Sequence, residues 1–328
     1  MRNIENKKFR VPCNSSHLII HKRKQAHIMF EKDQPVERTK KQAYLRIRLA
    51  MDCREDVILK VTVNNSTHKH VGDYDIRYAS VHHIYQIPVD SSLIESLYDH
   101  GCILTMTKGE SSISIFNEDD YYFKPHIYFE QDKSKRKMFH KLLASKVSVQ
   151  PFGWMEGCVL DGLYDLYSAT DLDMYKHAIF EHLEYFGINN GELIYENPRS
   201  IPFDNVIYGI ECTLPFSVIA KIEKTNKVLI IAKAFFKDKH KSSGKIIDGT
   251  VYSAEGYYTI AYPIAVMGDV YGDEDLLNMA YEDLTQRTNL LFNNCNVFLR
   301  HNEEDGNKSL VGHHNLWVSS GTGSFPSA

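Results

Sequence analysis

The sequence predicts a chain of two parts, an antiparallel β-sandwich followed by an array of α-helices. Before about residue 130, apolar residues alternate with polar ones in short segments, which is the period of a strand. After about residue 135 they recur every three or four residues, which is the period of a helix. A length of 328 residues also suggests two domains. We therefore predict a β-sandwich domain at 1–130, a helical domain at 131–310 and an irregular Gly- and Ser-containing tail at 311–328.

The predicted strands are short and are separated by turn-forming residues. They cover 43–49, 57–63, 82–89, 102–107 and 112–116. The second of them is rich in β-branched residues and ends at the turn signal Asn64-Asn65, and a short helix is expected at 91–99, before Gly101. Short strands at this spacing are typical of an antiparallel sandwich.

The predicted helices follow one another without strands between them. They cover 135–147, 153–170, 173–186, 209–224, 228–241, 254–271 and 275–292. Asp273 is expected to cap the start of the last one. The connections alternate between short and long, which is typical of helical hairpins that stack into a bundle, a solenoid or a closed toroid.

Charge and hydropathy exclude several classes of partner. The formal net charge is −4, so bulk electrostatics favour neither nucleic acid nor a membrane surface. No apolar stretch is long enough for a membrane span, and the polar first twelve residues, 1–12, do not form a secretory signal. We expect a cytoplasmic protein.

Cysteine and histidine spacing gives no indication of a metal or a cofactor. The six cysteines are scattered without a CxxC pair, and we expect buried free thiols, Cys158 among them, in a reducing compartment. Histidines recur at positions 17, 21, 27, 82 and 83, but this spacing fits no compact ligand set. We therefore predict no metal site and no cofactor.

Three segments place polar or aromatic side chains at the start of an otherwise apolar helix. Trp154 and Glu156 open the first of them, and Glu211 and Glu255 open the other two. If those helices begin at one cavity, the two carboxylates form a pair suited to general acid–base chemistry. The residues alone leave alternatives open: both glutamates could be ordinary helix-start acids favoured by the dipole, and Trp154 could be a core residue.

The helical part resembles the unsaturated glucuronyl and rhamnogalacturonyl hydrolases, glycoside hydrolase families 88 and 105. The segment Gly-Trp-Met-Glu-Gly-Cys-Val-Leu-Asp-Gly-Leu-Tyr from Gly153 is similar to the first toroid helix of that family. The segment from Ala254, followed by Gly272-Asp-Glu, resembles the catalytic helix. Phe298-Leu-Arg-His-Asn and Asp305-Gly resemble the lead into the next hairpin. The resemblance covers about 135–308 and excludes the β-rich part.

The resemblance implies an (α/α)6 toroid that removes a terminal 4,5-unsaturated uronic acid from an oligosaccharide. In this reaction a carboxylic acid protonates C4, water adds at C5, and the hemiketal collapses. The resemblance implies Glu255 as the main acid/base and Glu211 as its partner, and we expect their apolar neighbours to favour the neutral acid by desolvation. The implied substrate-binding residues are Trp154, Glu156, Tyr257, Tyr258, Tyr262, Arg300 and His301.

Two departures from the family suggest other functions. The family places Asp where this chain has Glu211 and Glu255. Only about seven of the expected twelve helices are readable, so we expect a partial toroid whose exposed apolar flank favours self-association. A non-catalytic carbohydrate-binding or scaffold protein of the same fold is the main alternative. Another is a sugar epimerase or a polysaccharide lyase, in which Tyr257 or Tyr258 would act with His301.

Overall fold

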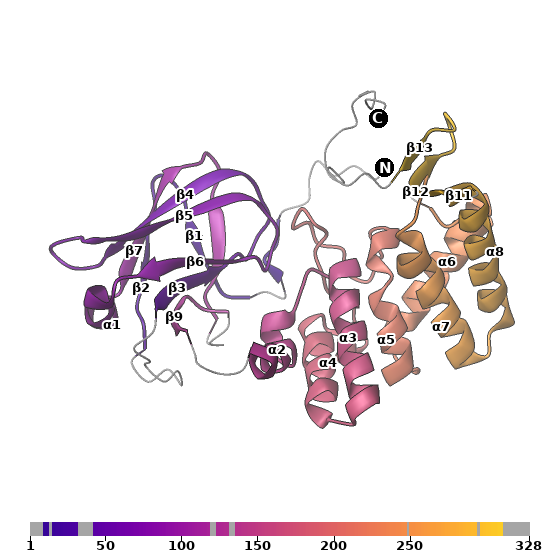
Figure 1. The fold of residues 1–328 in the computed structure, drawn as a ribbon, viewed down its shortest axis with the longest axis horizontal. Coiled ribbons are helices and arrows are strands. Elements are labelled where there is room, and N and C mark those ends of the chain that lie inside the picture. Colours follow the sequence, from indigo (N-terminus) through magenta and orange to yellow (C-terminus); the bar gives the residue numbers. More distant parts are fainter. Residues whose placement is uncertain are drawn as a thin grey trace.

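The computed structural model describes residues 9–12, 15–31, 42–118, 123–130, 135–247, 249–293 and 296–310. Strands dominate before residue 130 and helices after residue 135, so the described chain contains both sheets and α-helices (Figure 1). The predicted tail at 311–328 and two of the cysteines, Cys13 and Cys295, lie outside the described residues.

The β region, here residues 9–130, consists of antiparallel strands. They are β1 His17–Ile20, β2 Ala26–Ile28, β3 Ala43–Arg48, β4 Cys53–Val63, β5 His70–Ala79, β6 Ile84–Val89, β7 Cys102–Lys108, β8 Ile113–Phe116 and β9 His126–Phe129, with a short helix α1 at Ile94–His100. Their sheets have the orders β2-β7-β4-β5, β6-β3-β9 and β1-β8. The five predicted strands and the short helix are confirmed. β1, β2, β5 and β9 are additional to the prediction.

One hydrophobic core joins the sheets of the β region. Buried residues alternate along β3, so one face of that strand points into the core. The core also takes apolar side chains from β4, β5, β7, β8 and β9. Across it, the buried hydroxyl of Tyr74 on β5 donates a hydrogen bond of 2.9 Å to the carbonyl of Leu45 on β3, which ties the larger sheet to the smaller one.

The helices after residue 135 agree with the predicted segments. They are α2 Lys135–Leu143, α3 Trp154–Thr170, α4 Asp173–Tyr185, α5 Pro215–Ile222, α6 Val228–Ser243, α7 Tyr262–Tyr271 and α8 Glu274–Leu291. The side chain of Asp273 accepts a hydrogen bond from the backbone N–H of Leu276, which confirms the predicted N-cap. Pro215 lies in the first turn of α5, where a missing N–H costs little.

Short one-turn helices interrupt two of the predicted helices. A 3₁₀ turn, η5, covers Ile210–Cys212 before α5. A π-helical turn, η6, covers Tyr257–Ala261 before α7, and Pro263 lies in the first turn of α7. Two further 3₁₀ turns are η3 Lys146–Ser148 and η4 Ile188–Asn190.

The expectation of no strands between the later helices is wrong. β10 Val251–Ser253 lies between α6 and α7, and β11 Phe292–Asn293, β12 Asn296–Asn302 and β13 Lys308–Leu310 follow α8. β10 pairs with β12 in antiparallel register, with Ser253 opposite Arg300. Residues about 50 apart in sequence form this pairing, and the local periodicity on which the prediction rests carries no information about it.

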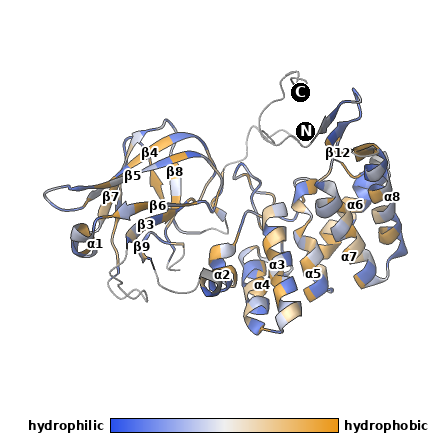
Figure 2. Cartoon of the chain, viewed as in Figure 1, coloured by the Kyte–Doolittle hydropathy of each residue, from blue (hydrophilic) through white to orange (hydrophobic). Residues whose placement is uncertain are grey.

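The described helices form successive hairpins. α3 packs against α4 and α7 against α8, while α3, α5 and α7 lie side by side in one row. Apolar residues concentrate on these packed faces (Figure 2). At Gly157 a Cβ would lie 2.5 Å from the side chain of Leu214, so this glycine allows α3 and α5 to approach closely. At Gly162 nothing lies within 4 Å, so a close approach there is not found.

Surface features of the described residues bear on several predictions. Cys53, Cys102 and Cys212 are buried free thiols as predicted, whereas Cys158 is exposed on α3, so its predicted burial is wrong. Within the described ranges, no helix combines the length and the apolarity that crossing a bilayer requires. α8 carries exposed apolar residues at Leu277, Tyr281 and Leu284. Self-association through such a flank stays a prediction.

Candidate functional site

A pocket of about 280 Å³ lies where the helices of the row begin. Its walls come from the start of α3, from η5, from the loop before η5, and from β10, β12 and the turn after β10. The lining residues are Pro151, Phe152, Gly153, Trp154, Met155, Pro198, Tyr208, Gly209, Ile210, Glu211, Cys212, Val251, Ser253, Glu255 and Arg300. The structure thus brings Trp154, Glu211, Glu255 and Arg300 to one cavity.

The strand pair β10–β12 forms one side of this pocket. Arg300 lies opposite Ser253 in the register, and the N–H of Ala254 donates a hydrogen bond of 2.8 Å to the carbonyl of Leu299. Glu255 follows directly. The unpredicted strands therefore place the guanidinium of Arg300 on the same side of the pocket as the carboxylate of Glu255.

Four of the lining residues with polar or aromatic side chains are open to solvent: Trp154, Tyr208, Glu211 and Glu255. Trp154 is 41% exposed and Tyr208 46% exposed, so neither ring belongs to the core. Glu211 and Glu255 are also exposed. We expected apolar neighbours to desolvate both carboxylates, and that expectation is wrong because both residues are exposed.

This combination of side chains suits a small acidic sugar. Exposed indole and phenol rings offer flat apolar faces for a sugar ring, and the phenol adds a hydrogen-bonding group. A guanidinium can bind a carboxylate through two parallel hydrogen bonds. Two carboxylates can exchange protons with a bound molecule. A volume of about 280 Å³ is near the lower end of the range for ligand pockets and fits one monosaccharide unit.

Glu156, predicted to bind substrate, is buried beneath the start of α3 and is not among the lining residues. Its Oε1 lies 2.8 Å from Nδ1 of His182 on α4, and its Oε2 accepts a 2.8 Å hydrogen bond from the N–H of Gln150. Both side chains of the Glu156–His182 pair are completely buried. Glu156 thus joins α3 to α4 and to the segment before α3.

The Glu156–His182 pair predicts a pH dependence of stability. Burial lowers the pKa of His182, but the charge and hydrogen bond of Glu156 outweigh it and raise the pKa above 6.5. The contribution to stability is therefore full below pH 6.5 and is lost as pH rises through the raised pKa. We expect the free energy of unfolding, measured with urea, to fall as the pH rises from 6.5 through the raised pKa of His182.

Two variants of α4 control this measurement. His182→Gln should abolish the dependence, whereas His177→Gln should retain it because His177 is exposed on the same helix. A wild-type free energy of unfolding that stays constant across this pH range would contradict the assignment.

Two of the predicted tyrosines belong to a polar cluster between α3, α5 and α7. The hydroxyls of Tyr258 and Tyr262 donate hydrogen bonds of 2.6 and 3.0 Å to the carboxylate of Asp161. Lys221 Nζ lies 3.2 Å from the same carboxylate and 2.5 Å from the hydroxyl of Tyr262. Burial, followed by Asp161, raises the pKa of Tyr258. The two tyrosines hold the helix row together and do not line the pocket.

The remaining predicted binding residues also lie outside the pocket lining. The hydroxyl of Tyr257 donates a 3.1 Å hydrogen bond to Thr288 on α8. His301 pairs in register with Tyr252, and successive residues of a strand point to opposite faces, so His301 faces away from the pocket side of Arg300. Among the described residues, no group of three or more His, Cys, Asp or Glu side chains could hold a metal ion.

Several lining residues were not predicted, and Tyr208 is the most prominent. The hydroxyl of the buried Tyr195 accepts a 2.7 Å hydrogen bond from the N–H of Tyr208 and donates one of 2.9 Å to the carbonyl of Val206. The ring of Phe203 contacts that of Tyr208 edge-on at 4.8 Å. A tyrosine three residues before Glu211 was the available signal in the sequence.

A buried arginine supports the wall that carries Glu255. Arg287 on α8 is completely buried and forms hydrogen bonds of 2.7 and 3.1 Å with Asp283. Its Nη1 donates to the carbonyl of Ser253 at 2.9 Å. A Cβ on Gly256 would lie 2.1 Å from the same nitrogen. Arg287 therefore contacts the backbone on both sides of Glu255.

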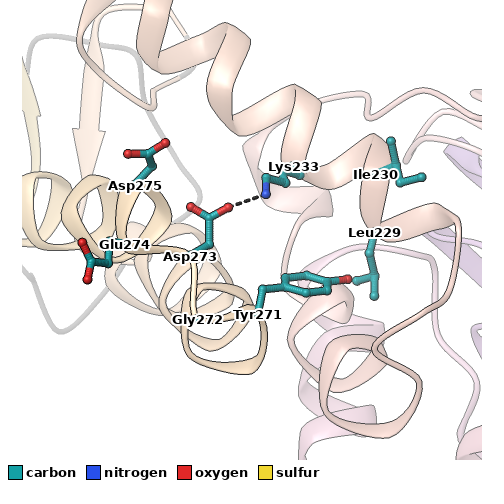
Figure 3. Close-up of a pocket in the computed structure, with 8 residues that line it drawn as sticks. All are labelled: Leu229, Ile230, Lys233, Tyr271, Gly272, Asp273, Glu274 and Asp275. Carbon is teal, nitrogen blue, oxygen red and sulfur yellow. Dashed lines mark hydrogen bonds and ion pairs between the residues drawn. The ribbon is translucent and has the colours of Figure 1, made fainter.

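A wider cavity of about 770 Å³ lies on the surface between α6 and the α7–α8 turn (Figure 3). Lys233 forms an ion pair there with Asp273, which also caps α8 (Figure 3). The hydrogen bond from Lys233 lowers the pKa of Asp273. Lys233 and Asp273 are already paired with each other in this cavity. We therefore assign the candidate site to the pocket of about 280 Å³ at the start of α3.

Comparisons with known proteins find distant similarity in solved structures. Two of these are described as possible members of the GH105 family. One, from Salmonella enterica serovar Paratyphi A, has a TM-score of 0.38 and 12% identity over 48% of this chain and 42% of that chain. The other, from Klebsiella pneumoniae, has a TM-score of 0.38 and 10% identity over 57% of this chain and 56% of that chain. The chain thus spans about half the length of these structures.

No family model matches the sequence. No curated protein matches it either. At a TM-score of 0.38, the two structural matches do not assign the chain to a family.

Proposed function

We propose that the chain is a glycoside hydrolase that removes terminal 4,5-unsaturated uronic acid residues from oligosaccharides. The observation that supports this is the meeting of Trp154, Glu211, Glu255 and Arg300 at one pocket, although they belong to four separate segments of the chain. An aromatic face, two carboxylates and a guanidinium are the groups that an unsaturated uronic acid requires.

In this proposal each of the four side chains has a separate role. Trp154 stacks on the sugar ring, and Arg300 binds the uronate carboxylate. Glu255 transfers a proton to C4 of the double bond, and a water molecule that loses its proton to Glu211 adds as hydroxide at C5. The hemiketal then opens and releases the rest of the oligosaccharide as an alcohol. The net change is the addition of one water.

The exposure of Glu211 and Glu255 bears on the proton transfer to C4, because that step needs a protonated carboxylic acid. A sugar bound in the pocket displaces the water around them, and two carboxylates close to one ligand favour a shared proton. Binding of the sugar is therefore expected to favour the neutral acid that proton transfer needs.

We interpret the fold of the whole chain in the same way. The sheets at 1–130, with one core between them, correspond to an antiparallel sandwich, and the hairpins at 131–310 correspond to part of an (α/α)6 toroid. The row of α3, α5 and α7 would be the inner wall of that toroid. The pocket then lies at the end where these inner helices begin.

The test follows the conjugated double bond of an unsaturated uronic disaccharide by its ultraviolet absorbance. We expect the purified chain to remove this absorbance steadily and to release the neighbouring sugar, with the saturated disaccharide left intact as a control. Because Glu211 and Glu255 are exposed, a second candidate is a pocket that binds the sugar without hydrolysing it. Quenching of Trp154 fluorescence without loss of absorbance would favour this second candidate and contradict hydrolysis.

A further inference from the structure

The loop between η4 and η5 forms one wall of the pocket through Pro198 and Tyr208. The internal contacts of this loop, made by Tyr195 and Phe203, fix the ring of Tyr208. On its other side the loop faces the β region (Figure 1), and the contacts made there connect the two halves of the chain.

Arg54 on β4 connects the β region to the pocket wall. Its Nη2 donates a 3.1 Å hydrogen bond to the carbonyl of Pro198, while its Nε donates to Asp52 at 2.7 Å. The N–H of Asp52 in turn donates a 2.9 Å hydrogen bond to Oγ of Ser200. Ser200 is buried and has a φ of +57°, so its position in the loop is closely defined.

In the segment before β1, Arg10 forms a hydrogen bond and ion pairs with the same loop. The N–H of Arg10 donates to the carbonyl of Ser200 at 2.9 Å. Its guanidinium forms ion pairs with Glu196 and, at 2.6 Å, with Asp204. Hydrogen bonding to Asp204 is the main cause that raises the pKa of Arg10. The loop is therefore held at both ends and in its middle.

The second wall segment has an anchor of its own in the β region. Arg48 on β3 is 2% exposed, and its Nη2 donates a 2.7 Å hydrogen bond to the carbonyl of Val149, two residues before Pro151 begins the pocket lining. Nearby, a cluster that includes Val11, Ala50 and Phe116 packs against Tyr185 of α4. The β region is thus packed against the helices and hydrogen-bonded to both wall segments.

We propose that the β region is a working part of the pocket: it sets the position of the wall that carries Pro198 and Tyr208, and Arg54 is the positioning residue that couples the two. The inference rests on the proposed function in taking an unsaturated uronic acid as the ligand. Glu255 and Arg300 line the pocket from other segments, which β12 and Arg287 hold in place. The β region therefore affects binding of the sugar and leaves the proton transfer unchanged.

The test compares Arg54→Ala with Arg77→Ala. Arg77 is matched because its guanidinium also binds an aspartate two residues away, Asp75, on the exposed surface of the β region. For Arg54→Ala we expect KM for the unsaturated disaccharide to rise about tenfold with kcat unchanged, since a hydrogen bond from a charged donor is lost. Arg77→Ala should match the wild type in both constants.

Hydrogen exchange of the free chain tests the coupling without any sugar. The amides at 197–208 should exchange faster in Arg54→Ala and in Ser200→Gly than in wild type or Arg77→Ala. Ser200→Gly tolerates the positive φ and removes the whole side chain, including the hydroxyl that accepts from the N–H of Asp52. Unchanged exchange in both Arg54→Ala and Ser200→Gly overturns the inference. If the two variants exchange faster but the wild-type chain neither binds nor hydrolyses the sugar, the coupling is supported and the proposed function is overturned.

Discussion

Replacing Glu255 by Gln should lower kcat for an unsaturated uronic disaccharide by about a hundredfold or more, with little change in KM. The amide keeps the shape of the side chain but cannot deliver the proton to C4, and general acid catalysis contributes about a hundred- to ten-thousandfold to a rate. The measurement is the initial rate of absorbance loss in the wild type and in the variant. A variant that keeps its rate within about threefold, far less than the loss of a general acid costs, would rule out Glu255 as the acid.

The matched control for this variant is Glu274→Gln. Glu274 is an exposed glutamate in the first turn of α8 and does not line the pocket. It therefore shares with Glu255 a position at a helix start and the same change in charge. Its rate should equal that of the wild type, which separates loss of the acid from a general effect of charge on the helical part.

Replacing Arg287 by Met should lower the free energy of unfolding by about 3–5 kcal/mol. The change leaves the carboxylate of Asp283 buried without its partner, and breaking one side of a buried ion pair has a cost of this size. The carbonyls of Ser253 and Ile246 also lose a donor. Urea denaturation measures the effect, and a loss below about 0.5 kcal/mol, the range of surface substitutions, would contradict it.

The double variant Arg287→Met with Asp283→Leu separates the ion pair from the packing. Removing both partners leaves no buried unpaired charge, so the double variant should lose less stability than Arg287→Met alone. Both variants lack the contacts of Arg287 with the backbone, so a double variant that is less stable than the single one would contradict a cost from the unpaired carboxylate of Asp283.

The starts and ends of the helices were predictable because the signals that set them are local. Asp273 caps α8 by a hydrogen bond to a residue three positions later. Pro215 begins α5 because its fixed φ and its missing N–H suit the first turn of a helix. The apolar period of each helix likewise lies within its own segment. These local signals also placed Trp154, Glu211 and Glu255 at helix mouths, which is where the pocket lies.

The strand pair β10–β12 was not predictable from local signals, although it completes the site. β10 is three residues long, too short for its alternation to be distinguished from a loop, and its partner strand begins more than 40 residues later. Arg300 was predicted to bind the substrate by resemblance alone. The structure adds the physical reason that it lies opposite Ser253, next to Glu255.

Tyr257, Tyr258 and Tyr262 were assigned to the pocket because the segment from Ala254 resembles the catalytic helix of the family. In the structure the N–H of Tyr262 bonds to the carbonyl of Tyr257, five residues earlier, so one turn is π-helical. A π turn changes which faces the following side chains occupy relative to a period of 3.6 residues. Tyr258 and Tyr262 accordingly meet Asp161 between the helices.

Glu156 was misplaced although the sequence held a usable signal. It lies four residues before Leu160 and seven before Leu163, both completely buried, so it belongs to the apolar stripe of α3. An acid on such a stripe needs a buried partner. His182 next to Leu183 on the apolar face of α4 supplies that partner.

A crystal structure of the Glu255→Gln chain with an unsaturated uronic disaccharide tests the central claim most directly. The inactive variant would hold the sugar intact. The result we predict is a uronic acid ring against the indole of Trp154, with its carboxylate bound by Arg300 and its double bond between residues 211 and 255. A disaccharide bound at any other surface, or a ring without contact to Trp154, would contradict the assignment of this pocket as the sugar site.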